Sequence, residues 1–190
     1  RSTVVSKNRP AAVSKFVPLT VDYRQKAAAA GRIPTHHLRR EIGQTEKEIL
    51  TSRLVDRSIR PLFPRGFVNE TQVVCNLMSL DGQNEPDVLA INAASTALAL
   101  SDIPFNGPIG AIRISATKNG DLISNPTRHE MNEALLNLVI ATNREGNVLM
   151  LEAFANEPVV EPILFKTIAK GIRDCKSIIS KIEQLQKELG

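Results

Sequence analysis

Arginine is the residue whose type and spacing in this chain most clearly suggest chemistry. A guanidinium group matches phosphate oxygens in a bidentate geometry and also stacks on nucleobases. Between residues 31 and 65, eight basic side chains face four acidic ones, and this balance of +4 equals the formal charge of the whole chain. The sequence therefore predicts that a polyanion binds at this stretch. The basic residues are Arg32, Arg39, Arg40, Lys47, Arg53, Arg57, Arg60 and Arg65.

A helix is expected in the second half of this stretch. Thr45 and Glu48 have the spacing of a capping box, in which each side chain bonds the backbone N–H of the other residue. Pro61 disfavours helical geometry at the residue before it. The helix should therefore run from Thr45 to about Arg60.

The expected helix has two distinct sides. Arg53, Arg57 and Arg60 recur at i, i+4 and i+7, so they share a narrow stripe opposite a broad apolar side. Such a stripe could hold successive phosphates. The alternative is an ordinary solvated face that pairs with Glu48 and Asp56. The apolar side comprises Leu50, Leu54, Val55 and Ile59.

The first half of the stretch, residues 32–43, lacks a clear period and is interpreted as a loop. Two consecutive arginines on it, Arg39 and Arg40, could reach the backbone of a nucleic acid. His36 and His37 are adjacent, and adjacent side chains diverge, so they are not expected to share a metal ion.

Motifs of several enzyme classes do not occur in the sequence. There is no Gly-x-Gly-x-x-Gly, no P-loop, no Gly-x-Ser-x-Gly and no zinc-ligand spacing. Asp81, Asp87 and Asp102 border expected turns, where aspartate commonly bonds the backbone. The residues alone therefore identify no catalytic group and no metal ligand. Phe63 and Phe67 lie near the arginines but are expected in the core, so composition favours phosphate contact over base stacking.

The composition, 42% hydrophobic and 23% charged over 190 residues with a pI of about 9.3, is ordinary for a globular protein and hints at nucleic-acid binding. Cys75 and Cys175 stand in apolar or helical contexts and are interpreted as reduced, buried thiols. No apolar run reaches the ~20 residues of a membrane span. The chain opens on what reads as the tail of a strand at Thr3–Val5, so its true N-terminus is expected to be missing.

Strands and helices interleave along the chain, with no internal repeat or linker. A single α/β domain spanning residues 1–190 is therefore expected, with helices packed on a sheet. The apolar, alanine-rich helix should be buried against that sheet. Strands are expected at 16–23, 71–80, 109–117, 121–125, 135–141 and 147–152, and helices at 24–30, 45–60, 87–100, 127–133 and 159–189.

The chain resembles the polynucleotide phosphorylase family over nearly all of residues 16–190. The similarity lies in Asp22–Arg24, Gly31–Pro34, Leu38–Glu41, Glu48–Pro64, Asn84–Asp87 and Ser101–Gly110. It covers the first of the family's two ribonuclease-PH-like core domains. The resemblance implies a mixed sheet with packed helices, of the ribosomal-protein-S5-domain-2-like type. Residues 27–30 and 84–95 look closer to animal mitochondrial members, which implies a mitochondrial setting.

The resemblance implies degradation of RNA from its 3′ end by phosphorolysis, with inorganic phosphate as co-substrate and nucleoside diphosphates as products. It also implies Mg²⁺ or Mn²⁺, a homotrimeric ring threaded by single-stranded RNA, and an RNA helicase partner in a degradosome-like complex. The principal catalytic groups are expected in a second core domain. The family's first hairpin, helical linker, second core and KH and OB-type modules are not expected in this chain.

Two groups of candidate RNA-binding residues follow from the resemblance. The family's pore-neck motif, Phe-Phe-Arg-Arg, falls on residues 37–40. Here Arg39 and Arg40 match, but His37 and Leu38 stand in place of the aromatic pair, and His37 could partly replace its stacking. Arg53, Arg57 and Arg60 fall on the family's arginine helix beside the RNA path. Two other functions remain open: a non-catalytic RNA-binding ring subunit of an exosome-like complex, and a small-molecule α/β enzyme.

Overall fold

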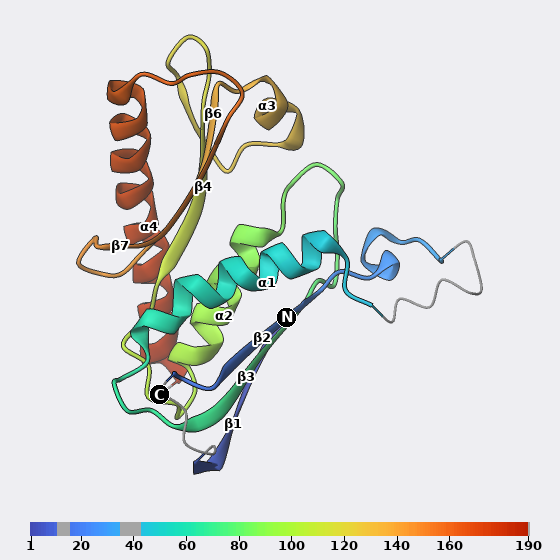
Figure 1. The fold of residues 1–190 in the computed structure, drawn as a ribbon, viewed down its shortest axis with the longest axis vertical. Coiled ribbons are helices and arrows are strands. Elements are labelled where there is room, and N and C mark those ends of the chain that lie inside the picture. The colour runs from blue at the N-terminus through green and yellow to red at the C-terminus, as the bar shows by residue number, and fades with distance from the viewer. Residues whose placement is uncertain (11–15, 35–42, 190) are drawn as a thin grey trace.

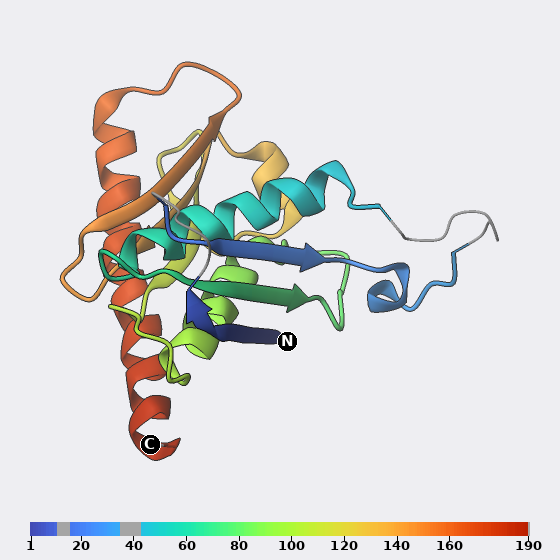
Figure 2. The ribbon, with the colours of Figure 1, turned by 60° about the horizontal axis from the view of Figure 1, so that its bottom comes forward.

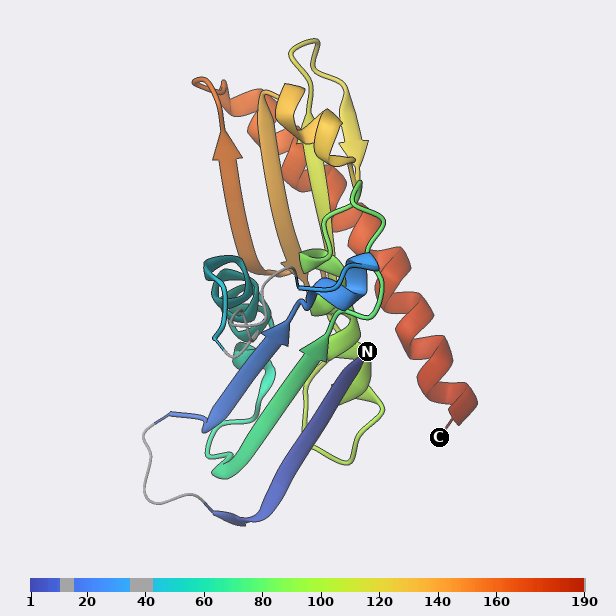
Figure 3. The same ribbon diagram turned by 90° about the vertical axis from the view of Figure 1, so that its right-hand side faces the viewer.

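The computed structural model describes residues 1–10, 16–34 and 43–189. Its elements form layers: a three-stranded sheet, then helices α1 and α2, then a four-stranded sheet, and finally the long helix α4 (Figures 1 and 3). The expected α/β class is confirmed. The strands are divided between two sheets, whereas one sheet was expected.

The first sheet has the order β1-β3-β2 and is mixed. β1 (Ser2–Pro10) runs antiparallel to β3 (Asn69–Asn76), and β2 (Leu19–Arg24) runs parallel to it. Alternate side chains face the helices, as the two-residue period of a strand requires. On β3 these inward side chains are Thr71, Val73 and Cys75, all of them buried.

The second sheet has the order β5-β4-β6-β7 and is antiparallel throughout. The expected hairpin around residues 118–120 joins β4 (Gly110–Ala116) to β5 (Leu122–Ser124), and Gly120 adopts the positive φ that suits glycine at such a turn. The second expected hairpin joins β6 (Leu136–Thr142) to β7 (Val148–Ala155). β4 and β6 are central strands, and nearly all their side chains are buried.

The predicted helices occur close to their expected bounds. They are α1 (Glu46–Ile59), α2 (Asp87–Ala99), α3 (Arg128–Glu133) and α4 (Glu161–Leu189). The alanine run, expected as a short helix, forms a 3₁₀ turn, η1 (Ala27–Ala30), and a second such turn, η2 (Arg60–Leu62), follows α1. The capping boxes of Thr45 with Glu48 and of Thr127 with Glu130 are both present.

The larger hydrophobic core lies between the two sheets. It joins Val73 of the first sheet, Val55 and Ile91 of the two inner helices, and Val139 of the second sheet. A smaller cluster lies between α4 and the outer face of the second sheet. There Gly171 permits close approach, since a Cβ at this position would come within 2.5 Å of Ile140 Cγ2.

The two inner helices thus have different surroundings. α1 lies along β2, and its N-terminal end lies beside the C-terminal end of that strand, toward residues 25–34 (Figure 2). α2 lies between the first sheet, β4 and α4. This arrangement decides which side chains of each helix reach solvent.

Candidate functional site

Helix α1 presents Arg53 and Arg57 on its exposed side. The two sides expected for this helix are confirmed, because Leu54, Val55 and Ile59 are buried in the core. Leu50 was also expected on the apolar side, but it is 52% exposed. It lies in the first turns of the helix, where the core does not cover it.

A depression of about 380 Å³ lies between α1 and β2, and both exposed arginines line it. Its other described lining residues are mainly small or neutral, and Asp56 is the only acidic residue among them. No ion pair joins Arg53 or Arg57 to another residue in the described part of the chain. Their guanidinium donors therefore remain available for an anionic ligand.

Arg60, the third arginine of the predicted stripe, has a different environment. Its Nε and Nη2 donate to the Asp56 carboxylate at 2.9 and 2.6 Å. Nη1 donates to the Val17 carbonyl at 2.8 Å, and Nη2 also donates to the Leu19 carbonyl at 3.0 Å. The hydrogen bonds to Asp56 raise the pKa of Arg60 further. Arg60 thus fastens the C-terminal end of α1 to the start of β2, and its contact with RNA stays a prediction.

Glu48 fastens the other end of the helix. The Glu48 residue is 5% exposed, and its carboxylate accepts hydrogen bonds from the Gln25 N–H at 2.7 Å, the Thr45 N–H at 2.6 Å and the Thr45 hydroxyl at 2.9 Å. Burial disfavours the charged form, but these donors outweigh it and hold the pKa of Glu48 below its usual value. The capping box was visible in the sequence. The bond to Gln25, at the end of the neighbouring strand, was not.

Ser52 completes this attachment one turn further along α1. Its hydroxyl oxygen accepts a hydrogen bond from the Tyr23 N–H at 3.0 Å and donates to the Glu48 carbonyl at 2.9 Å. Glu48, Ser52 and Arg60 therefore bind one side of α1 to β2 along its length. The exposed Arg53 and Arg57 lie on a helix whose position is fixed.

The remaining three candidates, His37, Arg39 and Arg40, lie outside the described residues. In sequence they lie between Gln25 and Thr45, two residues whose backbone N–H groups both donate to the Glu48 carboxylate. Their role in binding RNA stays a prediction.

Comparison with known proteins identifies the family. A model of the "3′ exoribonuclease family, domain 1" matches residues 2–104, more than half of the chain. The chain belongs to the 3′ exoribonuclease family. A second model, "3′ exoribonuclease family, domain 2", matches residues 107–173. The boundary between the two models falls just before β4, although the larger hydrophobic core draws residues from both sides of it.

Curated relatives show which members of the 3′ exoribonuclease family this chain resembles. A polyribonucleotide nucleotidyltransferase of Koribacter versatilis is 49% identical over 92% of the chain and 21% of its own length. One of Zymomonas mobilis is 49% identical over 91% and 23%, and one of Acidobacterium capsulatum is 44% identical over 100% and 23%. The expected similarity to polynucleotide phosphorylases is confirmed. These relatives are bacterial, and the chain spans less than a quarter of their length.

Among solved structures, rice (Oryza sativa) Rrp46 superposes with a TM-score of 0.71 over 98% of this chain and 82% of its own. The two sequences are only 17% identical, so this likeness shows the fold. It confirms the ribonuclease-PH-like fold class expected from the sequence.

Several residues that sequence reasoning missed form a second polar site, at the start of α2. Arg113 of β4 forms a mostly buried ion pair with Asp87, and Glu85 accepts from Lys47 at 2.6 Å and from Arg128 at 2.8 Å. Burial disfavours ionisation of Glu85, yet Lys47 and Arg128 hold its pKa below the usual value. No local pattern announced these pairs, because their partners are 26 to 43 residues apart in sequence.

The second polar site borders a pocket of about 250 Å³ lined by Glu85 and Arg113. Because Glu85 and Asp87 already have cationic partners, neither is free to act as a metal ligand or a general base. In the described part of the chain no three His, Cys, Asp or Glu side chains form a metal-binding group. These residues therefore do not fit the divalent cation that the family resemblance implies.

No described helix is long and apolar enough to span a membrane.

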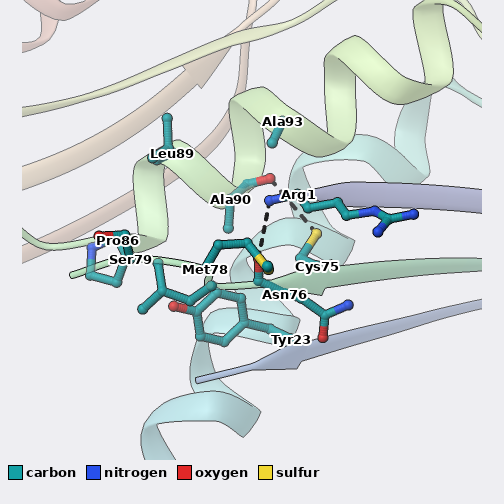
Figure 4. Close-up of a pocket in the computed structure, with 11 residues that line it drawn as sticks. Arg1, Tyr23, Cys75, Asn76, Met78, Ser79, Pro86, Leu89, Ala90 and Ala93 are labelled. Carbon is teal, nitrogen blue, oxygen red and sulfur yellow. Dashed lines mark hydrogen bonds between the residues drawn. The ribbon is translucent and has the colours of Figure 1, made fainter. Parts of the chain in front are cut away.

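A third pocket, of about 180 Å³, lies between the end of β3 and α2 (Figure 4). Tyr23 and Cys75 line it, and burial raises the pKa of both groups. Neither is therefore activated as a base or nucleophile. The predicted burial of both cysteines is confirmed, and burial raises the pKa of Cys175 to about 11.

Proposed function

We propose that this chain is the RNA-guiding domain of a polyribonucleotide nucleotidyltransferase, an exoribonuclease that shortens RNA from 3′ to 5′ by phosphorolysis. In that reaction an oxygen of inorganic phosphate attacks the terminal phosphodiester phosphorus, the bond to the preceding ribose 3′ oxygen breaks, and a nucleoside diphosphate leaves. The observation that carries the proposal is the exposed pair Arg53 and Arg57, which form no ion pair with a described residue and line the depression between α1 and β2. The names of the curated relatives support the reaction type.

Each site residue has a task in this proposal. Arg53 and Arg57 bind successive phosphates of single-stranded RNA, because guanidinium groups pair with phosphate oxygens whatever the base. Glu48 and Arg60 hold α1 at a fixed position on β2, so that the two exposed arginines keep their spacing. Arg39 and Arg40, with His37, grip the strand at a constriction.

The bond-breaking chemistry belongs to another part of the longer protein. Mg²⁺ or Mn²⁺ would neutralise charge on the reacting phosphate there, since the described residues of this chain offer no site for it. Residues 1–190 form one unit of a homotrimeric ring that meets an RNA helicase. The likeness of residues 27–30 and 84–95 to animal mitochondrial members supports a mitochondrial setting.

The salt dependence of RNA binding tests this proposal. In the full-length protein, Arg53→Ala with Arg57→Ala should weaken binding of single-stranded RNA regardless of sequence. The slope of log K against log salt should flatten by roughly one to two units, because binding releases fewer counterions when two phosphate contacts are lost. Lys118→Ala, on the turn between β4 and β5 and away from the depression, is the matched control. An unchanged slope in the double variant would show that these arginines do not touch phosphate.

A second measurement separates the enzyme from the non-catalytic ring subunit. The full-length protein with poly(A) and phosphate should release ADP, whereas residues 1–190 alone should release almost none. Phosphate-dependent release by residues 1–190 would contradict the division of labour. Absence of release by the full-length protein, with RNA binding retained, would favour the non-catalytic subunit.

A further inference from the structure

Helix α4 carries a second concentration of positive charge. Between residues 166 and 181, five basic side chains face one acidic side chain, a balance of +4 over 16 residues. The stretch between residues 31 and 65 has the same balance over 35 residues. Positive charge is therefore denser on α4 than on α1 and the segment before it. The five basic residues, which form the α4 basic stripe, are Lys166, Lys170, Arg173, Lys176 and Lys181.

The α4 basic stripe lies on the outer side of the helix. At 100° per residue its members fall within about 140° of one another, opposite the side that packs on β4 and β6. Four of them are exposed, and Lys170 is half-buried. α4 is the outermost layer of the molecule beyond the second sheet (Figures 1 and 3), so the stripe faces away from α1.

Helix stability does not explain a stripe of one sign. Like charges at i, i+3 and i, i+4 destabilise a helix, and Lys166, Lys170, Arg173 and Lys176 follow one another at these spacings. The one ion pair that the stripe forms with a described residue joins Lys170 to Asp174 at 2.9 Å. Lys166, Arg173 and Lys176 form none. The uniform charge therefore indicates a negatively charged ligand.

The acidic residues of α4 nearest the stripe already have partners. The Asp174 carboxylate accepts from the Ser124 hydroxyl at 2.7 Å as well as from Lys170. Burial disfavours its charged form, yet these donors hold the pKa of Asp174 below its usual value. Glu183 pairs with Arg144, on the turn between β6 and β7, at 3.3 Å. Neither carboxylate is left to neutralise the free cations of the stripe.

An exposed aromatic side chain borders the stripe. Phe165 is 64% exposed, and Ala169, Arg173 and Lys176 follow on the same side of α4 at i+4, i+8 and i+11. Surfaces that bind single strands combine cations along the backbone with aromatic rings on which bases stack. A protein–protein interface has instead an apolar core of several side chains. One aromatic ring beside a row of cations fits a nucleic-acid strand better than an acidic protein.

We propose that the α4 basic stripe and Phe165 form a second binding surface for single-stranded RNA. Phosphates pair with Arg173 and Lys176, and a base stacks on Phe165, so binding does not depend on sequence. The choice of RNA rests on the proposed function. Because α4 and α1 lie on opposite sides of the second sheet, this surface holds RNA that lies outside the depression lined by Arg53 and Arg57.

The salt dependence of RNA binding tests the cations of the stripe. The full-length protein is titrated with oligoadenylate in a phosphate-free buffer, in which phosphorolysis does not occur. Arg173→Gln with Lys176→Gln should flatten the slope of log K against log salt by roughly one to one and a half units. Glutamine has nearly the helix propensity of the residues that it replaces. Lys7→Gln with Lys118→Gln removes the same charge elsewhere and is the matched control. Equal slopes in the two double variants would overturn the proposal.

Replacement of Phe165 tests the stacking contact. Phe165→Ala should lower the affinity for oligoadenylate by at least about fivefold and leave the salt slope unchanged, because it removes stacking but no charge. Phe154→Ala is the matched control, since Phe154 on β7 is also 64% exposed. Equal affinities of the two variants would contradict a base on Phe165.

Lysine acetylation of the full-length protein identifies what covers the stripe. Lys166 and Lys176 should react in the free protein and lose reactivity when oligoadenylate is added, whereas Lys118 should react equally in both states. Protection of Lys166 and Lys176 before RNA is added would assign the stripe to a protein contact and overturn the proposal. Unchanged reactivity of both lysines with RNA bound would overturn it as well.

Comparison with the α1 arginines separates this inference from the proposed function. If Arg53→Ala with Arg57→Ala flattens the salt slope and the α4 double variant does not, the second surface is wrong and the proposed function stands. If neither double variant changes the slope, both are contradicted. A flattened slope in both double variants is the expected result.

Discussion

Arg53 and Arg57 on α1 and Arg113 on β4 show how differently one residue type is used in this molecule. The two arginines of α1 are exposed and have no ion pair with a described residue. The Arg113 side chain is only 15% exposed and pairs with Asp87, whose side chain is 11% exposed. Arg53 and Arg57 are left available to a ligand, whereas Arg113 forms an ion pair within the fold.

Burial explains this difference. A buried cation loses its hydration and must regain the energy from a carboxylate or other acceptors, so Arg113 requires Asp87. An exposed arginine keeps its hydration and needs no partner, so it can exchange water for phosphate at low cost. Arg60 lies between these limits, because it is partly exposed yet bonded to Asp56 and two carbonyls.

Removal of Asp87 should have the largest effect on stability. Asp87→Ala leaves Arg113 buried without its carboxylate, which should lower the free energy of unfolding by about 3–5 kcal/mol. Urea unfolding of the chain measures this loss. Asp56→Ala is the matched control, since its partner Arg60 is more exposed, and it should cost only about 1 kcal/mol. Equal losses in the two variants would show that burial does not make the Arg113–Asp87 pair more important for stability than the Arg60–Asp56 pair.

Truncation of Arg60 should have an intermediate effect on the free energy of unfolding. It decides whether Arg60 belongs with the ligand-facing arginines or with those paired within the fold. Arg60→Ala removes the hydrogen bonds to Asp56, Val17 and Leu19, so the free energy of unfolding should fall by about 1.5–3 kcal/mol. Arg57→Ala should stay within about 0.5 kcal/mol of the original chain, as a surface substitution does.

RNA binding supplies the other half of the Arg60 experiment. Arg57→Ala should flatten the salt dependence of RNA binding more than Arg60→Ala does, because the guanidinium donors of Arg60 are bonded to Asp56, Val17 and Leu19, whereas those of Arg57 bond no described residue. If Arg60→Ala flattened the slope and left stability unchanged, Arg60 would belong with the ligand-facing arginines. Both variants are measured against the same single-stranded RNA.

The pH dependence of Glu48 should give the smallest effect. Its pKa is lower in the folded state than in the unfolded chain, so it stabilises the fold above its unfolded pKa and loses this contribution as the pH falls through the folded value. Glu48→Gln should therefore cost about 1–2 kcal/mol at pH 7. The gap between the two proteins should narrow below about pH 4. A gap that stayed constant from pH 7 to pH 3 would show that ionised Glu48 does not fasten α1.

The arginine-bearing helix illustrates what could be predicted from sequence. Thr45 and Glu48 gave its start, Pro61 its end, and the helical period its exposed and buried sides. The strand bounds were less reliable, because Phe16 and Val17 alternate like a strand but β2 begins only at Leu19, where pairing with Thr71 starts. Local patterns report local geometry, whereas a strand begins where its partner begins.

The sequence by itself determined the pattern of helices and the concentration of positive charge between residues 31 and 65, because caps, turns and periodicity act over a few residues and charge depends only on composition. The family and its fold class followed from the resemblance of whole motifs. The tertiary structure alone decided that Arg60 fastens α1 to β2, that Arg113 pairs with Asp87, and that Leu89 of α2 stays exposed. These outcomes depend on partners tens of residues away, and whether an arginine is free or paired is settled only when the folded chain brings its neighbours together.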